Sequence, residues 1–277
     1  MIIIIIPSLY LSCKFKGLDN ISKIILIGAG NVATQLGMAL QKAGYQIEQV
    51  YSRTIDSAKD LANKLHTNFT TDSVQIQPNA DLYIITVSDD AVPGLLSELN
   101  FPNGLIVHTS GSLDLDILAP VSENIGVFYP LQTFSKNRES DFSTIPICIE
   151  AGNPRNLNLI KKVALKLTER VYEISSHQRK VLHLAAVFAC NFPNFMYTVA
   201  EDISLQGKVD FNLLKPLILE TATKVLEHSP ADVQTGPAKR NDQVIMNKHL
   251  DLLSEFPQYR SLYESISREI NKKHFKL

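Results

Sequence analysis

Residues 23–33 read KIILIGAGNVA, and the architecture of the chain can be worked out from this segment. Its first half is a short apolar run rich in β-branched residues, which is typical of a central strand in a parallel sheet. Its second half has the pattern GxGxxA, directly after that strand and directly before a helical pattern. Gly28 permits a tight turn, Gly30 lets the backbone approach a diphosphate, and Ala33 lets the helix pack closely on the strand. Because the free amides of a helix N-terminus bind anions, the segment predicts a dinucleotide-binding turn, with a tight turn that binds nothing as the alternative.

Strands and helices continue to alternate after this turn. Further strand patterns occur at 46–52, 81–87, 104–108, 124–129 and 145–150. Helical patterns occur between them at 31–43 and 56–65, and later, with no strands between them, at 177–206, 211–228, 240–255 and 258–272. Strands alternating with helices predict βαβ units with right-handed crossovers. We therefore expect an α/β fold, with a Rossmann-type, mainly parallel sheet followed by an all-helical C-terminal domain.

These patterns divide the chain into four expected segments. They are an N-terminal extension at 1–20, a Rossmann-like domain at 21–152, a connecting helix and strand at 153–175, and a helical domain at 176–277. The extension begins MIIIIIPSLY, which has no basic residue before its apolar core and no small-residue cleavage site after it. A non-targeting extension is therefore favoured over an export signal or an extra edge strand, and whether it belongs to the mature protein stays open.

Composition limits the classes of function. The chain has 277 residues and a net charge of -1, which argues against nucleic-acid binding. No apolar run approaches the roughly 18–20 residues that span a membrane. The 3 cysteines are too sparse for a disulfide framework, so we expect a cytoplasmic protein, with Cys148 and Cys190 buried in apolar segments. No metal-binding spacing of His and Cys occurs, so we expect no metal.

The end of the second strand bears on the cofactor. NAD-binding proteins usually carry Asp or Glu there for the ribose hydroxyls. Here the strand ends Tyr51-Ser52-Arg53-Thr54, which offers hydroxyls and a guanidinium suited to a 2′-phosphate. NADP is therefore favoured over NAD, with a solvated arginine as the alternative. The expected cofactor-binding residues are Gly28, Gly30, Asn31, Val32, Ser52, Arg53, Thr54, Val87, Ser88 and Asp89.

Three other strand ends are polar, and ligands of open α/β sheets bind beyond the carboxyl ends of strands. In VSDD (87–90), the carboxylates of Asp89 and Asp90 could line the site or could simply cap the next helix. HTSGS (108–112) could bind a carboxylate or the nicotinamide carboxamide, or its serines could act as ordinary caps. In YPLQTFS (129–135), the proline sets a rigid turn that would aim Gln132 and Thr133 at the cleft.

The helical half carries its own polar residues. At 100° per residue, His183, Asn191 and Asn194 share one face of an otherwise apolar helix, which Pro193 should kink. Each could also be a satisfied core polar group. Arg240, within TGPAKRND (235–242), could clamp a substrate carboxylate or form a structural ion pair with Asp242 or Glu220.

Taken together, these motifs resemble a family of NADP oxidoreductases with a Rossmann-like N-terminal domain and a helical C-terminal domain of unknown function. The motifs are GAGNVA (28–33), YSR (51–53), VSDD, HTSGS, YPLQTFS, HLAAVFACNF (183–192) and TGPAKRND. More distantly, the chain resembles pyrroline-carboxylate reductases, deazaflavin-dependent NADP reductases and β-hydroxyacid dehydrogenases. The resemblance implies hydride transfer to or from a C=O or C=N bond of a small metabolite, which we expect to bear a carboxylate. It also implies a cleft between the domains and a homodimer formed through the helical domain.

One departure from the distant relatives affects the expected chemistry. β-Hydroxyacid dehydrogenases carry a catalytic Lys about one turn before an Asn, whereas here Asn191 matches that Asn and the preceding turn holds Val187. We therefore expect His183 to be the general acid, with His108 as the competing candidate and Asn191 orienting the substrate. The missing Lys also leaves open a non-catalytic NADP-binding sensor. The expected substrate-binding residues are Thr109, Ser110, Gly111, Ser112, Gln132, Thr133, Asn194 and Arg240.

Overall fold

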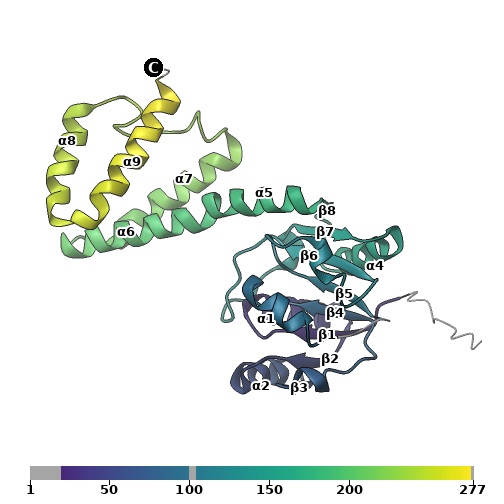
Figure 1. Cartoon of the computed structure of the whole chain (residues 1–277). Coiled ribbons are helices and arrows are strands. Elements are labelled where there is room, and N and C mark those ends of the chain that lie inside the picture. The colour runs from purple at the N-terminus through teal and green to yellow at the C-terminus, as the bar shows by residue number, and fades with distance from the viewer. Residues whose placement is uncertain (1–19, 100–103, 276–277) are drawn as a thin grey trace, which may run out of the picture. The chain divides into compact units, whose positions relative to one another are not determined.

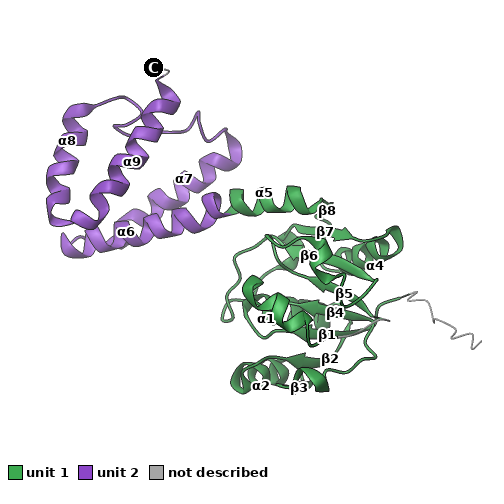
Figure 2. Ribbon diagram, viewed as in Figure 1, with its two compact units in different colours: residues 1–186 green, residues 187–277 purple. Residues whose placement is uncertain are grey.

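The computed structural model describes residues 20–99 and 104–275, which form two compact units, residues 1–186 and 187–277 (Figure 2). Nearly all of the expected N-terminal extension lies outside the described residues. No helix in the described ranges is long and apolar enough to cross a membrane. The units divide about ten residues later than the expected start of the helical domain at 176, because the first helix after the sheet belongs to the first unit.

The first unit is built on an eight-stranded sheet with the order β3-β2-β1-β4-β5-β6-β7-β8 (Figure 1). The strands are β1 Lys23–Ile27, β2 Gln46–Tyr51, β3 Asn68–Thr70, β4 Leu82–Ile85, β5 Leu105–His108, β6 Ile125–Pro130, β7 Ile147–Ala151 and β8 Val171–Glu173. Strands β1 to β6 run parallel, and β7 runs antiparallel to β6. The order 3-2-1-4-5-6 is that of a Rossmann fold, so the predicted fold class is confirmed.

Five α-helices accompany the described strands of this unit. They are α1 Asn31–Lys42, α2 Ile55–Lys64, α3 Val92–Leu96, α4 Pro154–Leu165 and α5 Ser176–Ala186. The start of α4 follows from sequence, because Asn153 caps it by accepting from Asn156 N at 2.9 Å. β8 pairs with β7 in parallel, so the strand of the expected connecting segment is part of the sheet.

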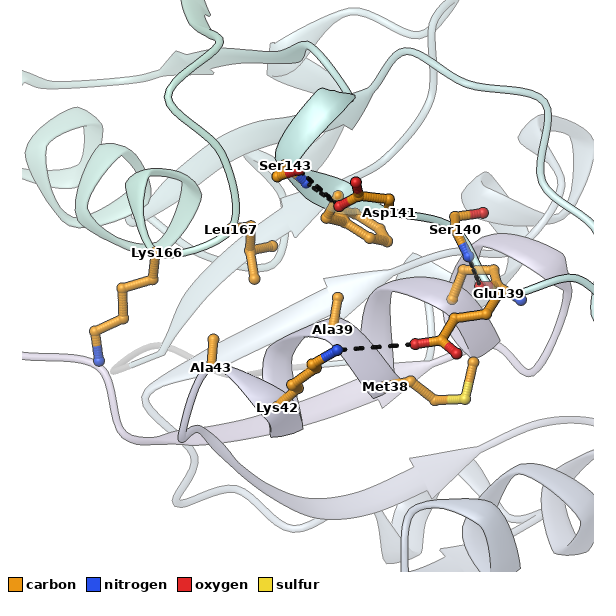
Figure 3. Close-up of a pocket in the computed structure, with 12 residues that line it drawn as sticks. Met38, Ala39, Lys42, Ala43, Glu139, Ser140, Asp141, Ser143, Lys166 and Leu167 are labelled. Carbon is orange, nitrogen blue, oxygen red and sulfur yellow. Dashed lines mark hydrogen bonds and ion pairs between the residues drawn. The ribbon is translucent and has the colours of Figure 1, made fainter.

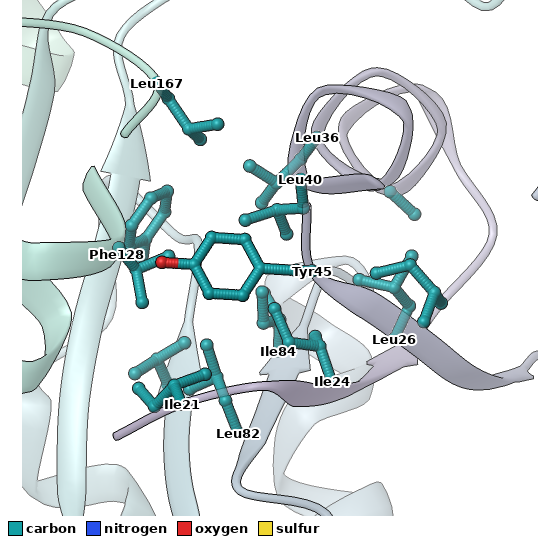
Figure 4. Close-up of a cluster of buried hydrophobic side chains, with 14 of the residues drawn as sticks. Ile21, Ile24, Leu26, Leu36, Leu40, Tyr45, Leu82, Ile84, Phe128 and Leu167 are labelled. Atoms are coloured by element: carbon teal, nitrogen blue, oxygen red, sulfur yellow. The ribbon is translucent and has the colours of Figure 1, made fainter. Parts of the chain in front are cut away.

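The core explains why β1 is apolar from Ile24 to Ile27. Ile24 and Leu26 lie in a hydrophobic cluster on one face of the sheet, whereas Ile25 and Ile27 lie in a second cluster on the other. All four side chains are fully buried. Figure 4 shows the first cluster around Tyr45. A strand covered on both faces needs apolar residues at successive positions, which is the pattern of Ile24 to Ile27, whereas Lys23 at the start of the strand is exposed.

The second unit contains only helices among its described residues, as predicted. A π-helical turn, Val187–Asn191, precedes α6 Phe192–Gln206, and α7 Lys215–Glu227, α8 Gln243–Leu252 and α9 Pro257–His274 follow. Pro193 cannot donate to residue 189, and the π turn Val187–Asn191, with its five-residue hydrogen-bond spacing, lies next to it.

The π turn changes what the sequence pattern implied for this helix. A spacing of 100° per residue does not hold through it, so the predicted shared face of His183, Asn191 and Asn194 is not a straight stripe. Asn191 and Asn194 are both exposed. Cys190 lies within the same turn and is also exposed, so the expectation that it is buried is wrong, whereas Cys148 is buried in β7.

Candidate functional site

The two glycines of the first turn differ in what requires them. Gly28 has φ +124°, and an added Cβ would lie 2.3 Å from Thr86 Oγ1, so the fold itself requires a glycine there. Gly30 has φ -82° and ψ -165°, a conformation open to any residue. An added Cβ at Gly30 would meet no atom within 4 Å. The described protein therefore does not explain Gly30, but a ligand that approaches the backbone closely would explain it.

The N-terminus of α1, next to Gly30, has no side chain that caps its first amides. The helix begins at Asn31. Because the first amides of a helix have no partner within the helix, they need an acceptor from elsewhere. Gly28 N donates to Tyr51 O at 2.8 Å, which ties this turn to the end of β2. The turn thus presents unpaired amides next to the second strand, as the sequence predicts.

A pocket of about 580 Å³ lies at the carboxyl ends of β1, β2 and β4. It coincides with the point where the strand order reverses, which is where open α/β sheets bind ligands. Seven of the expected cofactor-binding residues line it: Gly28, Gly30, Ser52, Arg53, Thr54, Val87 and Ser88. Among the other lining residues, sequence reasoning missed the polar Ser57, Thr86, Glu98 and Lys136.

Positive charge in this pocket is unpaired. Arg53 is exposed and Lys136 is half-buried, and neither forms an ion pair within the described ranges. Two carboxylates, Asp90 and Glu98, also line the pocket, and Glu98 Oε2 accepts from Ser73 Oγ at 2.5 Å. An anionic ligand would therefore meet two cations without displacing an existing ion pair.

Three expected cofactor residues do not line the pocket. Asn31 Nδ2 donates to Phe134 O at 3.0 Å, so its side chain holds the loop after β6. Val32 is half-buried in the first turn of α1. Asp89 accepts a hydrogen bond from the Ser112 hydroxyl and caps no helix, so the capping alternative is not observed for it.

His108 ends β5 and is buried, with 1% of its surface exposed. Its Nδ1 accepts from Ser110 N at 3.2 Å. Burial, followed by the nearby Arg179 guanidinium, lowers the pKa of His108 to about 4, although the backbone of Asp114 acts in the opposite direction. The imidazole is therefore neutral near pH 7, and it lacks the exposure that a general acid needs.

The rest of the HTSGS loop is held by short-range bonds. Ser110 Oγ accepts from Ser112 N and from Leu113 N, both at 3.0 Å, so Ser110 closes a local turn. The helical segment that follows, Leu115–Leu118, has Asp114 and not Ser110 at its N-cap position. Thr109 Oγ1 donates to Ile85 O at 3.2 Å and binds the loop to the end of β4.

His183 lies half-buried on α5, against the same loop. An added Cβ at Gly111 would lie 2.6 Å from the His183 ring, so the glycine lets loop and ring make contact. His183 Nδ1 lies 3.1 Å from Tyr129 Oη, at the carboxyl end of β6. Burial raises the pKa of Tyr129 to about 12, so its hydroxyl keeps its proton and can donate to Nδ1. A neutral His183 then carries its own proton on Nε2.

A buried ion pair fixes the start of α5. Arg179 is fully buried and pairs with Glu150 of β7, and its guanidinium also donates to Leu113 O and, at 3.1 Å, to Ser176 Oγ. Glu150 also accepts from Ser176 N at 2.9 Å. This network ties α5 to the sheet and to the loop after β5, and His183 follows Arg179 one turn later. Sequence reasoning missed it, although a carboxylate inside a buried strand was a usable signal.

Four other expected substrate-binding residues are exposed. Gln132 Oε1 accepts from Thr133 N at 2.8 Å, so these two side chains engage each other. In the second unit, Asn194 and Arg240 are exposed, and Arg240 has no ion pair with a described residue. Its expected partners are engaged elsewhere, because Glu220 pairs with Lys224 and Asp242 caps α8 through Ile245 N.

A second pocket of about 500 Å³ lies between α1, residues 139–143 and the segment that follows α4 (Figure 3). Its charged groups largely satisfy one another or their own backbone. Lys42 approaches Glu139 at 4.0 Å, and Asp141 accepts from Ser143 N at 3.0 Å. It includes neither the glycine turn nor a strand end, so we do not regard it as the functional site. Within the described ranges no group of His, Cys, Asp and Glu could hold a metal ion.

Comparisons with known proteins agree with this geometry. A Rossmann-like domain family matches residues 19–132, and the domain of unknown function DUF2520 matches residues 145–270. The crystal structure of a putative NADP oxidoreductase from Bacteroides fragilis is 43% identical, has a TM-score of 0.86, and covers 92% of this chain and 100% of its own. An imine reductase from Myxococcus stipitatus in complex with NADP+ is 18% identical with a TM-score of 0.60, covering 90% of this chain and 93% of its own, which shows a shared fold.

One curated relative matches a shorter region. Glutamyl-tRNA reductase from Sulfolobus acidocaldarius is 28% identical over 110 residues, which are 37% of this chain and 26% of that protein. The match therefore spans about a quarter of the relative's length.

Proposed function

The chain belongs to the family in which a Rossmann-like domain precedes a DUF2520 domain, and from this premise we propose that it is an NADP-dependent oxidoreductase. Its substrate is a small metabolite with a C=O or C=N bond and a carboxylate. The observation that carries the proposal is the open turn at Gly30, where the fold leaves room for a ligand that it does not itself require. The 43% identical relative described as an NADP oxidoreductase supports the same cofactor.

The pocket fits NADP better than NAD. The amides at the start of α1 would hold the diphosphate, and Ser52, Arg53 and Thr54 would hold the ribose and its 2′-phosphate. No carboxylate ends β2, where NAD-binding folds place an acceptor for the ribose hydroxyls. Asn31 and Val32 contribute their backbone amides, because their side chains are engaged or half-buried.

His183 is the favoured proton donor. When bound, the dinucleotide supplies or accepts the hydride, and a group of this chain must move the accompanying proton. Ligands of open α/β sheets bind beyond the carboxyl ends of the strands, so the proton donor would come from residues near the ends of β4, β5 and β6. Tyr129 lies at the end of β6, and His183 of α5 contacts both Tyr129 and Gly111 of the loop after β5, whereas His108 is buried and neutral. We assign Tyr129 as the residue that orients the His183 ring.

The remaining assignments are carried by sequence alone. Asn191 would orient the substrate, and Asn194, Arg240 and the loops at 109–112 and 132–133 would bind it. Substitution of Asn194, Arg240, Gln132 or Thr133 to Ala should raise KM for the substrate more than it lowers kcat, because these groups would bind substrate and transition state alike.

The enzyme function is tested by NADPH oxidation. Purified protein should oxidise NADPH with at least one member of a panel of cyclic imines, 2-oxo acids and semialdehydes, and His183→Asn should lower that rate at least about tenfold. Tight NADPH binding without turnover of any panel member would instead favour the alternative, a non-catalytic NADP sensor. The absence of a Lys one turn before Asn191 is the observation that favours this alternative.

We also propose a cytoplasmic homodimer formed through the helical unit. Several leucines of α7 are largely exposed within one chain, including Leu217 at 61%, Leu219 at 68% and Leu226 at 86%. A second copy would remove this apolar surface from water. Light scattering should give a dimer mass that Leu219→Lys converts to a monomer mass. Leu165→Lys, on an equally apolar but isolated site of α4, should leave the dimer intact.

A further inference from the structure

The loop after β6 carries a lysine into the nucleotide pocket, and two side chains of α1 hold that loop in place. We propose that Lys136 binds the diphosphate of the dinucleotide, and that Asn31 and Gln35 are positioning residues that fix it there. The inference rests on the proposed function, because it assumes that a dinucleotide binds, and it adds residues that the glycine turn and the end of β2 do not supply.

The attachment of the loop to α1 uses side-chain amides. Asn31 Nδ2 donates to Phe134 O at 3.0 Å, and Gln35 Nε2 donates to Ser135 O at 2.7 Å. Gln35 Oε1 accepts from Ser140 N at 3.1 Å, so one buried amide binds both ends of the loop. Gln35 is 2% exposed, and a buried amide of this kind is expensive to leave unpaired. The loop is therefore fixed on the helix before any ligand arrives.

The tip of the loop is a tight turn. Ser135 and Arg138 form an isolated antiparallel bridge that leaves Lys136 and Asn137 at the tip. Lys136 is half-buried and lines the pocket together with Gly30 and Arg53. Arg138 is exposed and does not line it. The turn therefore places one of its two cations in the pocket and leaves the other outside it.

The attachment points favour the diphosphate over the 2′-phosphate as the partner of Lys136. Asn31 is the first residue of α1, so the segment from Phe134 to Lys136 starts beside the amides that face the diphosphate. Arg53 instead follows β2, which is the side of the ribose. Lys136 has no ion pair among the described residues, so its charge is available to a ligand, although Asp90 and Glu98 also line the pocket.

Calorimetry with NADPH and NADH separates the two phosphate contacts. NADPH and NADH share the diphosphate. Lys136→Met should therefore lower the affinity for both nucleotides by about the same factor, roughly tenfold for a charged hydrogen bond. Arg53→Met should weaken NADPH far more than NADH. Arg138→Met removes the same charge from the same turn and should change neither by more than about twofold, because this side chain lies outside the pocket.

Each other result overturns the inference. Unchanged affinities in Lys136→Met, a loss confined to NADPH, or an equal loss in Arg138→Met would each remove the assigned contact. If the wild-type protein binds neither nucleotide, the proposed function fails as well. If it binds NADPH through Arg53 while Lys136→Met is silent, only this inference fails.

The positioning role is tested by a double-mutant cycle. Gln35→Met should weaken both nucleotides several-fold although Gln35 does not line the nucleotide pocket. In the Lys136→Met background, the same change should have little further effect, since it acts through Lys136. Asn31→Ala repeats the test at an exposed position and does not disturb the core. Fully additive losses would show that the amides act independently of Lys136 and would overturn the positioning role.

Discussion

Two arginines of the first unit have opposite surroundings. Arg179 is fully buried, pairs with Glu150 and donates to a backbone carbonyl and a serine hydroxyl. Arg53 is exposed, lines a pocket and has no ion pair within the described residues. A buried arginine must be paired because its desolvation is costly, so Arg179 is part of the framework. Arg53 has no structural partner in the pocket that it lines, and we propose that it binds an anion there.

The largest expected effect is on the free energy of unfolding, and it comes from the buried Arg179. Arg179→Met should lower the free energy of unfolding by about 3 kcal/mol, because it leaves Glu150 and Leu113 O without their buried donor. Urea denaturation followed by far-UV circular dichroism measures it, since the chain has no Trp for fluorescence. Arg53→Met should cost less than about 0.5 kcal/mol. Equal losses in the two variants would remove the distinction.

The buried His108 should make the free energy of unfolding depend on pH. Its folded pKa of about 4 lies below its ordinary value of 6.5, so the unfolded state binds more protons between these values. Stability is therefore fully present above pH 6.5 and falls as the pH drops toward 4, by up to about 3 kcal/mol. His108→Asn keeps an acceptor for Ser110 N and should flatten this dependence, whereas the exposed His177→Gln should preserve it. An unchanged slope in His108→Asn would contradict the assignment.

Gly28 and Gly30 differ in the same way as the two arginines: the fold requires the first, and we propose that a ligand requires the second. Gly28→Ala should lower the free energy of unfolding by about 1–3 kcal/mol, because φ is positive and the added Cβ meets Thr86. Gly30→Val should leave stability nearly unchanged but abolish detectable dinucleotide binding. Parallel denaturation and calorimetry measure both properties. A Gly30→Val protein that binds NADPH normally would show that the open space at Gly30 serves no ligand.

The smallest effect concerns Tyr129. Tyr129→Phe should cost about 1 kcal/mol and leave His183 Nδ1 without its donor. Nitrogen-detected NMR of the imidazole should show the Nε2–H tautomer in the wild-type protein and a mixture of tautomers in the variant. The same tautomer ratio in both proteins would remove Tyr129 from the positioning role.

Much of the fold, and the pocket at the ends of β1 and β2, could be predicted from residues that are neighbours in the sequence. The segment KIILIGAGNVA predicts strand, turn and helix from neighbouring residues, and the absence of an acid after β2 is equally local. The three-residue β3 was missed because three residues carry no usable periodicity. The π turn before Pro193 was missed. The sequence shows that Pro193 has no backbone N–H to donate, but not which change in the helix compensates for it.

The contacts that complete the site join distant parts of the chain. Arg179 meets Glu150 and Leu113, Tyr129 meets His183, and Gln35 meets Ser135 and Ser140. Single-sequence patterns place each residue on a strand, helix or loop but do not say which of them touch. Lys136 is the clearest case. Its sequence context is that of an ordinary loop lysine, and only the contacts of Asn31 and Gln35 with its loop show that it lines the pocket.

The central claim is that the corner formed by Gly30 and Arg53 binds NADP through its phosphates. Titration calorimetry of the wild-type protein and Arg53→Asp with NADPH and NADH tests it directly. We predict that the wild-type protein prefers NADPH and that Arg53→Asp loses this preference or reverses it, while retaining its free energy of unfolding. A wild-type protein that binds neither nucleotide, or an Arg53→Asp variant with unchanged preference, would contradict the claim.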